Sequence, residues 1–326
     1  MSVFPGNESA RAALAAAMAS GTLHHAWLIA GPEGLGKGAF ARAAAARLLA
    51  EAGEPAALRG AWDVAEDSRT AHLIASGAHP DFRELVRLPK DPDKPDESLA
   101  RSITIAQVRS LQAMFATKSS FSGRRVVVID SVNDLEPGGA NALLKSLEEP
   151  PEGTIFLLVS HAIGRLLPTI RSRCRLLRFD PLADDQVAAI LRAELPDAGA
   201  DEIAALVRAG EGSPGRALGF AGLDLAALEA EMTAIAEGGD PSNAIRVRLA
   251  RTLGAKAAQA RYEAFLGRAP SFIAERARGR SGEPLRAALD AYHAARDLAG
   301  AALGLSLDAT ATVFEMGGLL ARLARA

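Results

Sequence analysis

Residues 31–38 read Gly-Pro-Glu-Gly-Leu-Gly-Lys-Gly, and they follow the apolar run Ala-Trp-Leu-Ile-Ala at 26–30. The alanine-rich segment 39–49 comes next and predicts a helix. A strand, a glycine loop with GxxxxGK spacing and a helix predict a phosphate-binding loop, in which backbone N–H groups and the helix N-terminus face an anion. The alternative, an ordinary glycine turn, is disfavoured by the intact spacing. The candidate nucleotide-binding residues of this loop are Gly31, Gly34, Gly36 and Lys37.

Two positions of this candidate site lack the groups that ATP hydrolysis requires. The residue after the lysine is Gly38, where a phosphate-binding loop normally has the Ser or Thr hydroxyl that binds Mg²⁺. The strongest predicted strand, residues 124–130, ends in Asp130, the position of a carboxylate that orients Mg²⁺. Hydrolysing ATPases of this kind carry a glutamate next, but this chain has Ser131, whose hydroxyl is a poor general base. We therefore expect no intrinsic ATPase activity.

Composition narrows the class of protein. A chain of 326 residues is long enough for two or three domains. Its formal net charge of -2 gives no overall attraction for nucleic acid, so contacts with DNA must be local or shared with partner chains. The single cysteine, Cys174, excludes an intramolecular disulfide and a cysteine-built zinc site. No apolar segment could span a bilayer and residues 1–7 show no signal-peptide pattern, which predicts a soluble cytoplasmic protein with no membrane partner.

Predicted strands and helices alternate up to about residue 179, which indicates an α/β domain with a parallel sheet. The predicted strands are 26–30, 79–86, 124–130, 154–160 and 175–179, and the predicted helices are 8–20 with Asn7 as its cap, 39–49, 103–118, 141–149 and 166–173. Residues 51–77 give weak signals, and the Pro- and Lys-rich residues 88–102 predict a projecting loop. After Asp180-Pro181 only helical patterns follow, at 184–195, 201–209, 214–220 and from 223 onwards. The last set is expected to break near four glycine positions: Gly238-Gly239, Gly254, Gly282 and Gly304. The predicted domains are therefore 1–179, 180–222 and 223–326.

Histidine and cysteine side chains raise two further alternatives. His24 and His25 precede the first strand, and adjacent residues of a strand point to opposite faces. We therefore expect structural roles for them rather than a shared metal ion. Cys174 is expected to be a buried structural thiol rather than a nucleophile, because it lies at a helix-to-strand junction.

Several motifs occur together in the order and spacing of the AAA+ clamp-loader family. They are 31–38, 126–130, the run Asn-Ala-Leu-Leu-Lys-Ser-Leu-Glu-Glu-Pro-Pro at 141–151, Thr-Ile-Arg-Ser-Arg-Cys at 169–174, His-His-Ala-Trp at 24–27 and Ala-Gln-Val-Arg at 106–109. Residues 1 to about 220 resemble this family through specific motifs, and the remainder through an all-helical region of suitable length. The resemblance implies a RecA-like AAA+ domain at 1–179, a small helical lid at 180–222 and an oligomerising helical collar at 223–326.

The resemblance also implies roles for single residues. Arg173 lies in a triplet similar to the family's SRC motif, which implies an arginine finger for ATP on a neighbouring subunit. Its small neighbours, Ser172 and Cys174, predict a guanidinium free to leave the surface. Ser160 is similar to the sensor 1 residue, and Arg216 to a sensor 2 residue that faces the chain's own nucleotide pocket. The alternative for Arg173 is a surface arginine in a basic run. The alternative for Arg216 is that its segment simply begins a helix.

The chain departs from the family in two places. It lacks the four-cysteine zinc module that many relatives carry after the loop helix, so we expect no zinc. Residues 131–139 are unlike the usual segment after the strand aspartate, which puts the local helix geometry in doubt. For the charged residues of the predicted helix 141–149, a solvated face with ion pairs and a contact between subunits both stay open: Lys145, Glu148 and Glu149.

The function implied by the resemblance is a non-hydrolysing clamp-loader subunit of the DNA polymerase III holoenzyme, a DNA-directed DNA polymerase (nucleotidyltransferase). The expected partners are the other subunits of a hetero-pentamer, the sliding clamp, and primed DNA reached through the complex. No cofactor is required, and whether the degenerate pocket binds ATP without hydrolysing it stays open. The alternative is a catalytically active ATPase subunit of a clamp or helicase loader, against which Gly38 and Ser131 argue. A stand-alone nucleotide-binding regulator is disfavoured, because a finger needs a neighbour.

Overall fold

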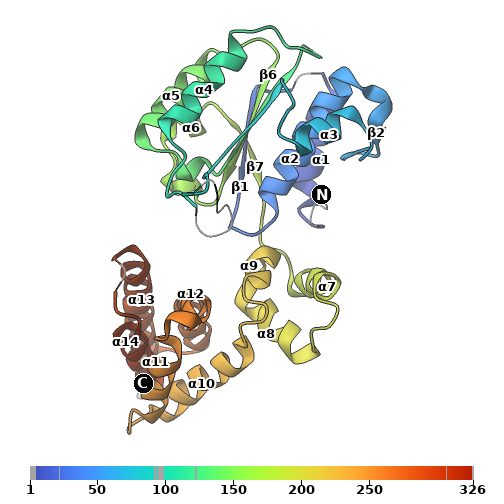
Figure 1. Ribbon diagram of the computed structural model, residues 1–326. Helices are drawn as coiled ribbons and strands as arrows, with labels where there is room; N and C mark the ends of the chain where they lie inside the picture. Colours follow the sequence, from blue (N-terminus) through green and yellow to red (C-terminus); the bar gives the residue numbers. More distant parts are fainter. Residues whose placement is uncertain are drawn as a thin grey trace. The chain divides into compact units, whose positions relative to one another are not determined.

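The computed structural model describes residues 5–21, 23–91, 93, 99–121, 123–305 and 307–324. Contacts divide the chain into two units, Met1–Gln186 and Val187–Ala326. The first unit contains a sheet with helices on both of its faces, and the described part of the second contains helices and turns (Figure 1). The predicted α/β domain followed by a helical part is thus confirmed. The finer division of the helical part at residue 222 stays a prediction.

The first unit is built around a five-stranded parallel sheet. Its spatial order is β4 (Phe82–Val86), β5 (Arg125–Asp130), β6 (Thr154–Ser160), β1 (Ala26–Ala30) and β7 (Arg175–Arg178). In the register, Ile29 lies opposite Val159, and Ile129 lies opposite Leu158. The three central strands are buried almost throughout, which explains why their sequences are continuous apolar runs rather than alternating patterns.

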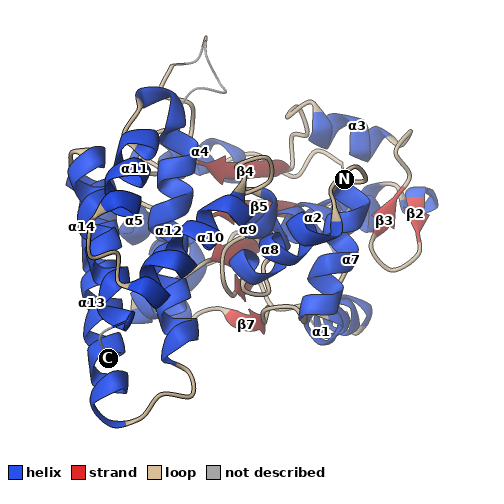
Figure 2. Ribbon diagram, turned by 90° about the horizontal axis from the view of Figure 1, so that it is seen from below, coloured by secondary structure: helices blue, strands red, loops and turns tan. Residues whose placement is uncertain are grey.

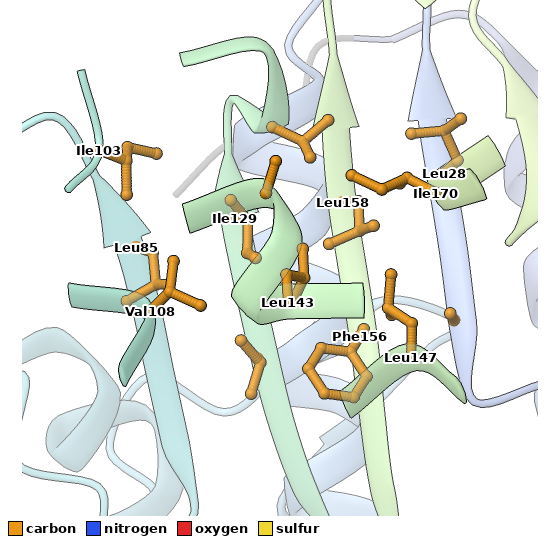
Figure 3. Close-up of a cluster of buried hydrophobic side chains, with 14 of the residues drawn as sticks. Leu28, Leu85, Ile103, Val108, Ile129, Leu143, Leu147, Phe156, Leu158 and Ile170 are labelled. Carbon is orange, nitrogen blue, oxygen red and sulfur yellow. The ribbon is translucent and has the colours of Figure 1, made fainter. Parts of the chain in front are cut away.

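Helices cover both faces of this sheet. On one face lie α1 (Glu8–Ala19), α2 (Lys37–Gly53) and α3 (Arg69–Ala75), and on the other lie α4 (Ile105–Phe115), α5 (Pro137–Glu148) and α6 (Pro168–Arg171) (Figure 1). The second group packs on the sheet through a buried cluster that includes Val108, Leu143, Leu147 and Ile170 (Figure 3). Burying one such side chain contributes about 1.5–3 kcal/mol. This packing fixes the end of α5, which carries Glu148, and the short helix α6, which lies two residues before Arg173.

The start of the chain corrects one prediction. Asn7 does precede α1, but with φ 54° and with no side-chain cap on the helix. Its amide instead bonds to the segment after β7: Nδ2 donates to the Asp180 carbonyl at 3.1 Å, and Oδ1 accepts from the Asp180 N–H at 2.7 Å. The predicted cap is therefore wrong, because a distant backbone pair takes both halves of the amide.

Other differences concern short elements. Residues 51–77 contain the 3₁₀ turn Pro55–Ala57, the hairpin of β2 (Leu58–Arg59) and β3 (Asp63–Val64), and α3, which are too short to give a periodic signal. The helix predicted from 141 begins at Pro137, a residue suited to a first helical turn, after the 3₁₀ turn Val132–Asp134. Of the predicted loop 88–102, residues 92 and 94–98 lie outside the described residues, and Pro89 and Leu99 form an isolated bridge.

The helical part follows the predicted order closely. Its helices are α7 (Asp184–Glu194), which crosses the boundary between the two units, α8 (Ala200–Gly210), α9 (Pro214–Leu218), α10 (Leu225–Gly238), α11 (Ala244–Leu253), α12 (Gln259–Ala277), α13 (Gly282–Leu305) and α14 (Ala309–Ala321). Short 3₁₀ turns lie at Ile163–Arg165 in the first unit and at Lys256–Ala258 and Arg322–Ala324 here. The described strands all belong to the first unit and are drawn in red in Figure 2. Predicted breaks at Gly239, Gly254 and Gly282 coincide with helix ends.

A buried ionic network joins three of these helices. The side chain of Arg268, on α12, is 1% exposed. Its Nε lies 2.8 Å from Oε1 of Glu229 on α10, and its two terminal nitrogens bond both oxygens of Glu275 at 2.9 and 2.8 Å. Arg208 on α8 contacts the other oxygen of Glu229 at 2.9 Å. Because breaking a buried pair leaves an uncompensated charge, this network fixes α8 and α10 against α12.

Candidate functional site

The glycine loop leaves β1 at the carboxyl edge of the parallel sheet, where α/β proteins place ligands. Gly34 and Gly36 have φ of 80° and 75°, values that residues other than glycine rarely adopt. Gly31 is required for a different reason, because a Cβ there would lie 2.0 Å from the carbonyl oxygen of Phe179. Its N–H donates to the Ser160 carbonyl at 3.2 Å. The loop is therefore fixed against the ends of β6 and β7.

Lys37 points into this loop rather than into solvent. It is 2% exposed, and its ammonium group donates to the carbonyl oxygen of Pro32. Burial lowers the pKa of Lys37 to about 8, and the nearby charges of Asp130 and Glu33 act in the opposite direction. The lysine of the motif is thus a buried cation whose charge interacts with that of Asp130.

Asp130 lies where a metal-binding side chain would be. A Cβ on Gly38 would be 1.9 Å from Oδ2 of Asp130, so the carboxylate occupies the space of the missing Ser or Thr. The same oxygen lies 4.0 Å from Nη1 of Arg42, which contacts Oε1 of Glu84 at 2.7 Å. The residues present do not fit a nucleotide-bound Mg²⁺, because the hydroxyl is absent and cationic side chains already neighbour the carboxylate.

The candidate sensor residue Ser160 is enclosed in a hydrogen-bond network. Its hydroxyl donates to Oδ1 of Asn133 at 3.0 Å, and the backbone N–H of His161 donates to the same oxygen at 2.9 Å. Ser131 is also buried, and its hydroxyl accepts from the Asn133 N–H at 3.2 Å. The two serines therefore support the local backbone, and Ser131 offers no base for activating water.

Two residues of this site were missed by sequence reasoning. His161 follows β6, and its pKa is lowered chiefly by burial and also by the charge of Lys37. Arg42 lies on α2, one turn after Gly38, and contacts Glu84 and Asp130. The only sequence signal for His161 is its place directly after a strand, at the carboxyl edge of the sheet.

Arg173 lies two residues beyond the end of α6 and is anchored by polar contacts. Its Nη2 lies 2.6 Å from Oε1 of Glu148, and its Nη1 donates to the Thr169 carbonyl at 2.9 Å. The side chain is 33% exposed. In this structure the guanidinium is thus held by a carboxylate at the end of α5, and its ability to leave the surface stays a prediction.

Arg216 lies at the start of α9 in the second unit, where the Ser213 hydroxyl caps the helix by accepting from the Arg216 N–H. Its guanidinium pairs with Glu211 and donates to the Gly267 carbonyl at 3.4 Å. A helix does begin at Pro214, as the helix-start alternative expects. A role for Arg216 toward the nucleotide pocket of the first unit stays a prediction.

The histidine and cysteine alternatives can be compared with the structure. His24 and His25 both precede β1, and their rings stack with centroids 4.4 Å apart, so the expectation of opposite faces was wrong. Nε2 of His25 donates to the Leu147 carbonyl at 3.0 Å. Cys174 is half-buried rather than buried as expected, and this partial burial raises its pKa to about 12, which keeps the thiol protonated. Among the described residues, no group of three or more His, Cys, Asp or Glu is arranged to hold a metal ion.

No helix in the part of the chain that the structure describes combines the length and the apolar character needed to cross a membrane.

Comparisons with known proteins agree with the motifs. The family model described as "DNA polymerase III, delta subunit" matches residues 6–183, more than half of the chain. The DNA polymerase III subunit delta' of Pseudomonas aeruginosa is 38% identical over 192 residues, which cover 58% of this chain and 53% of that protein. The Escherichia coli subunit of the same name is 33% identical over 205 residues, covering 63% and 57%.

The matches cover only part of the curated relatives, and the solved structure has low sequence identity to this chain. This chain spans about half the length of the relatives it matches. A solved Thermotoga maritima DNA polymerase III gamma subunit-related protein covers 97% of this chain and 99% of its own, at 13% identity and a TM-score of 0.42, which is too low to carry an argument. The match of the family model over most of the first unit decides the assignment, and the chain belongs to the DNA polymerase III delta-subunit family.

Proposed function

We propose that this chain is a non-hydrolysing subunit of a clamp loader, similar in its motifs to the delta-prime subunit of bacterial DNA polymerase III. It would assemble with ATP-driven subunits into a hetero-pentamer that places a sliding clamp on primed DNA. The observation that carries the proposal is the position of Asp130, whose carboxylate fills the space of a side chain at residue 38. A loop that retains its shape but has no room for the metal-binding hydroxyl suits a structural subunit.

The first unit would act as a rigid support. Buried Lys37 and half-buried Arg42 provide positive charge beside Asp130, where a metal ion would otherwise be needed. Asp130 therefore has positively charged neighbours without a bound Mg²⁺. Any nucleotide that binds here would have to displace the contact between Lys37 and the Pro32 carbonyl.

The chain's chemical contribution would be Arg173, supplied to ATP bound on a neighbouring subunit. A guanidinium stabilises the negative charge that spreads over the phosphoryl oxygens during transfer. Two observations support this role: the short helix before Arg173 is anchored in the core by Ile170, and the guanidinium is partly exposed. An exposed end on a rigid element is what a residue acting in trans needs.

The helical collar at 223–326 would provide the assembly surface. Its described residues expose five apolar side chains that such an assembly would cover: Val247, Leu289, Leu305, Leu307 and Phe314. Covering them would remove apolar area from water, which favours association.

A two-part experiment tests the proposed function. The purified chain, with Mg²⁺ and primed DNA, should show no turnover near about 1 s⁻¹, the low end for working enzymes. The same chain, mixed with the ATP-driven subunits of its own clamp loader, should co-elute with them on sizing, and a chain truncated after residue 222 should not. Turnover by the chain alone, or an intact complex with the truncated chain, would contradict the proposal.

A further inference from the structure

The end of α5 and the end of α6 meet at one ion pair. Oε1 of Glu148, the last residue of α5, lies 2.6 Å from Nη2 of Arg173. The opposite terminal nitrogen of the arginine donates to the Thr169 carbonyl, one turn earlier in the chain, at 2.9 Å. The two contacts hold the guanidinium from two directions, although the residues are far apart in sequence.

The backbones that carry this pair are fixed by the core. Leu143 and Leu147 on α5 and Ile170 on α6 are all at most 1% exposed and belong to one buried cluster (Figure 3). The distance between the helix ends is therefore set by packing rather than by the ion pair. The side chains themselves lie outside the core, because that of Arg173 is 33% exposed and that of Glu148 is 49% exposed. The ion pair therefore orients the arginine side chain, which core packing does not fix.

We propose that Glu148 is the positioning residue of Arg173, which orders the guanidinium before it meets ATP on the neighbouring subunit. The inference rests on the proposed role of Arg173 as a finger. An arginine side chain loses substantial rotamer entropy when it is fixed in one geometry. A carboxylate that fixes it beforehand removes part of that cost from the transition state. A guanidinium has five N–H donors, and Nη1 of Arg173 donates to the Thr169 carbonyl and, at 3.4 Å, to the Ser172 hydroxyl. Donors on Nη2 and Nε therefore remain for phosphoryl oxygens beside the Glu148 carboxylate.

The chain supplies a matched control for this carboxylate. Glu149 is the adjacent residue, is also exposed, and makes no ion pair with Arg173 among the described contacts. Removing Glu149 changes net charge and local helix-end electrostatics in the same way as removing Glu148. It leaves the contact to Arg173 in place.

The test is a double-mutant cycle in the reconstituted clamp loader, with ATP hydrolysis measured in the presence of clamp and primed DNA. Glu148→Ala should lower kcat about two- to fivefold, the range that an ion pair between partly exposed groups provides, and leave the KM for ATP unchanged. Glu148→Gln, which keeps the shape and loses the charge, should lie between the wild type and Glu148→Ala. Glu149→Ala should match the wild type. With Arg173→Ala already present, Glu148→Ala should have no further effect.

Each other result has a distinct meaning. If Arg173→Ala itself leaves hydrolysis unchanged, the proposed finger role fails and this inference fails with it. If Arg173→Ala lowers kcat but Glu148→Ala does not, the finger role stands and positioning by Glu148 is overturned. An equal loss from Glu148→Ala in both backgrounds assigns Glu148 a structural role instead. A gain in kcat means that the pair restrains the arginine, which also overturns the inference.

Discussion

Oδ2 of Asp130 lies 1.9 Å from the point where a Cβ on Gly38 would be. The absence of a hydroxyl side chain at residue 38 and the position of the Asp130 carboxylate therefore depend on each other. A side chain at residue 38 and the present orientation of Asp130 exclude each other on steric grounds. Restoring the motif by a single substitution should disturb the site rather than revive it.

We expect Gly38→Ser to lower the free energy of unfolding by about 1 kcal/mol and to confer no ATPase activity. The carboxylate of Asp130 would have to rotate away from Arg42 to admit the new side chain. Denaturant unfolding and a turnover assay of the purified chain check both parts. Gly164→Ser is the matched control, because a Cβ there meets nothing within 4 Å. ATP hydrolysis by Gly38→Ser would contradict the steric explanation.

Lys37→Met should stabilise the chain at neutral pH. The lysine has its ordinary pKa of 10.5 when unfolded and about 8 when folded, so below pH 8 the folded state bears the full cost of the buried charge. Between pH 8 and 10.5 the unfolded chain binds more protons, and the unfolding free energy of the wild type rises with pH. The advantage of the variant, about 1–3 kcal/mol at pH 7, should therefore shrink toward pH 10.5.

Denaturant unfolding of both proteins at pH 7, 8.5 and 10 measures this difference. Lys256→Met, at an exposed lysine, should show no such trend. A difference between Lys37→Met and the wild type that is independent of pH would show that the charge of Lys37 is not the cause.

Arg173→Ala should leave folding and assembly unchanged and reduce ATP hydrolysis by the complete clamp loader. A supplied arginine contributes about 10³–10⁵ in rate in the best-measured GTPases, but other active sites of the assembly would keep the loss in total turnover smaller. Arg173→Lys should not rescue the rate, because an ammonium group lacks the planar fork. Arg171→Ala, at an exposed arginine two residues earlier, is the control. Equal losses for both variants would reduce Arg173 to one member of a basic run.

Arg268→Ala should lower the unfolding free energy of the helical unit by about 3–5 kcal/mol, because it leaves Glu275 and one oxygen of Glu229 without their buried partner. Arg248→Ala breaks an exposed pair with Glu231 and should cost at most about 1 kcal/mol. Denaturant unfolding of the full chain, followed by circular dichroism, compares the two. Similar small losses would mean that water reaches the network of Arg268.

Much of the first unit could be predicted because its central strands carry an unambiguous local signal. β1, β5 and β6 are buried on both faces, so each is a continuous apolar run bounded by turns, and their order along the chain gave the parallel α/β class. The helices of the second unit could also be predicted, from the helical spacing of their apolar residues and from the glycines that separate them. The hairpin of β2 and β3 was missed because two residues per strand are too few to show a period.

The contacts of the candidate site could be predicted less well, because they join residues that are distant in sequence. Gly38 and Ser131 indicated the missing chemistry, yet nothing local indicates that Asp130 fills the space beside residue 38. The same holds for Glu148, which could have belonged to a solvated helix face and instead contacts Arg173. The residue types indicated which catalytic groups are missing. The contacts of Asp130 and Arg173 became visible only when the packing of the sheet and helices was known.

The two hydrogen bonds between Asn7 and Asp180 also have a mechanical meaning. They tie the beginning of the first unit to the point where the chain leaves its edge strand, 173 residues later. Tension applied to the chain beyond Asp180 would therefore be shared between β7 and α1 instead of peeling β7 from the sheet alone. A single side-chain amide thus anchors the first helix and the end of the edge strand to each other.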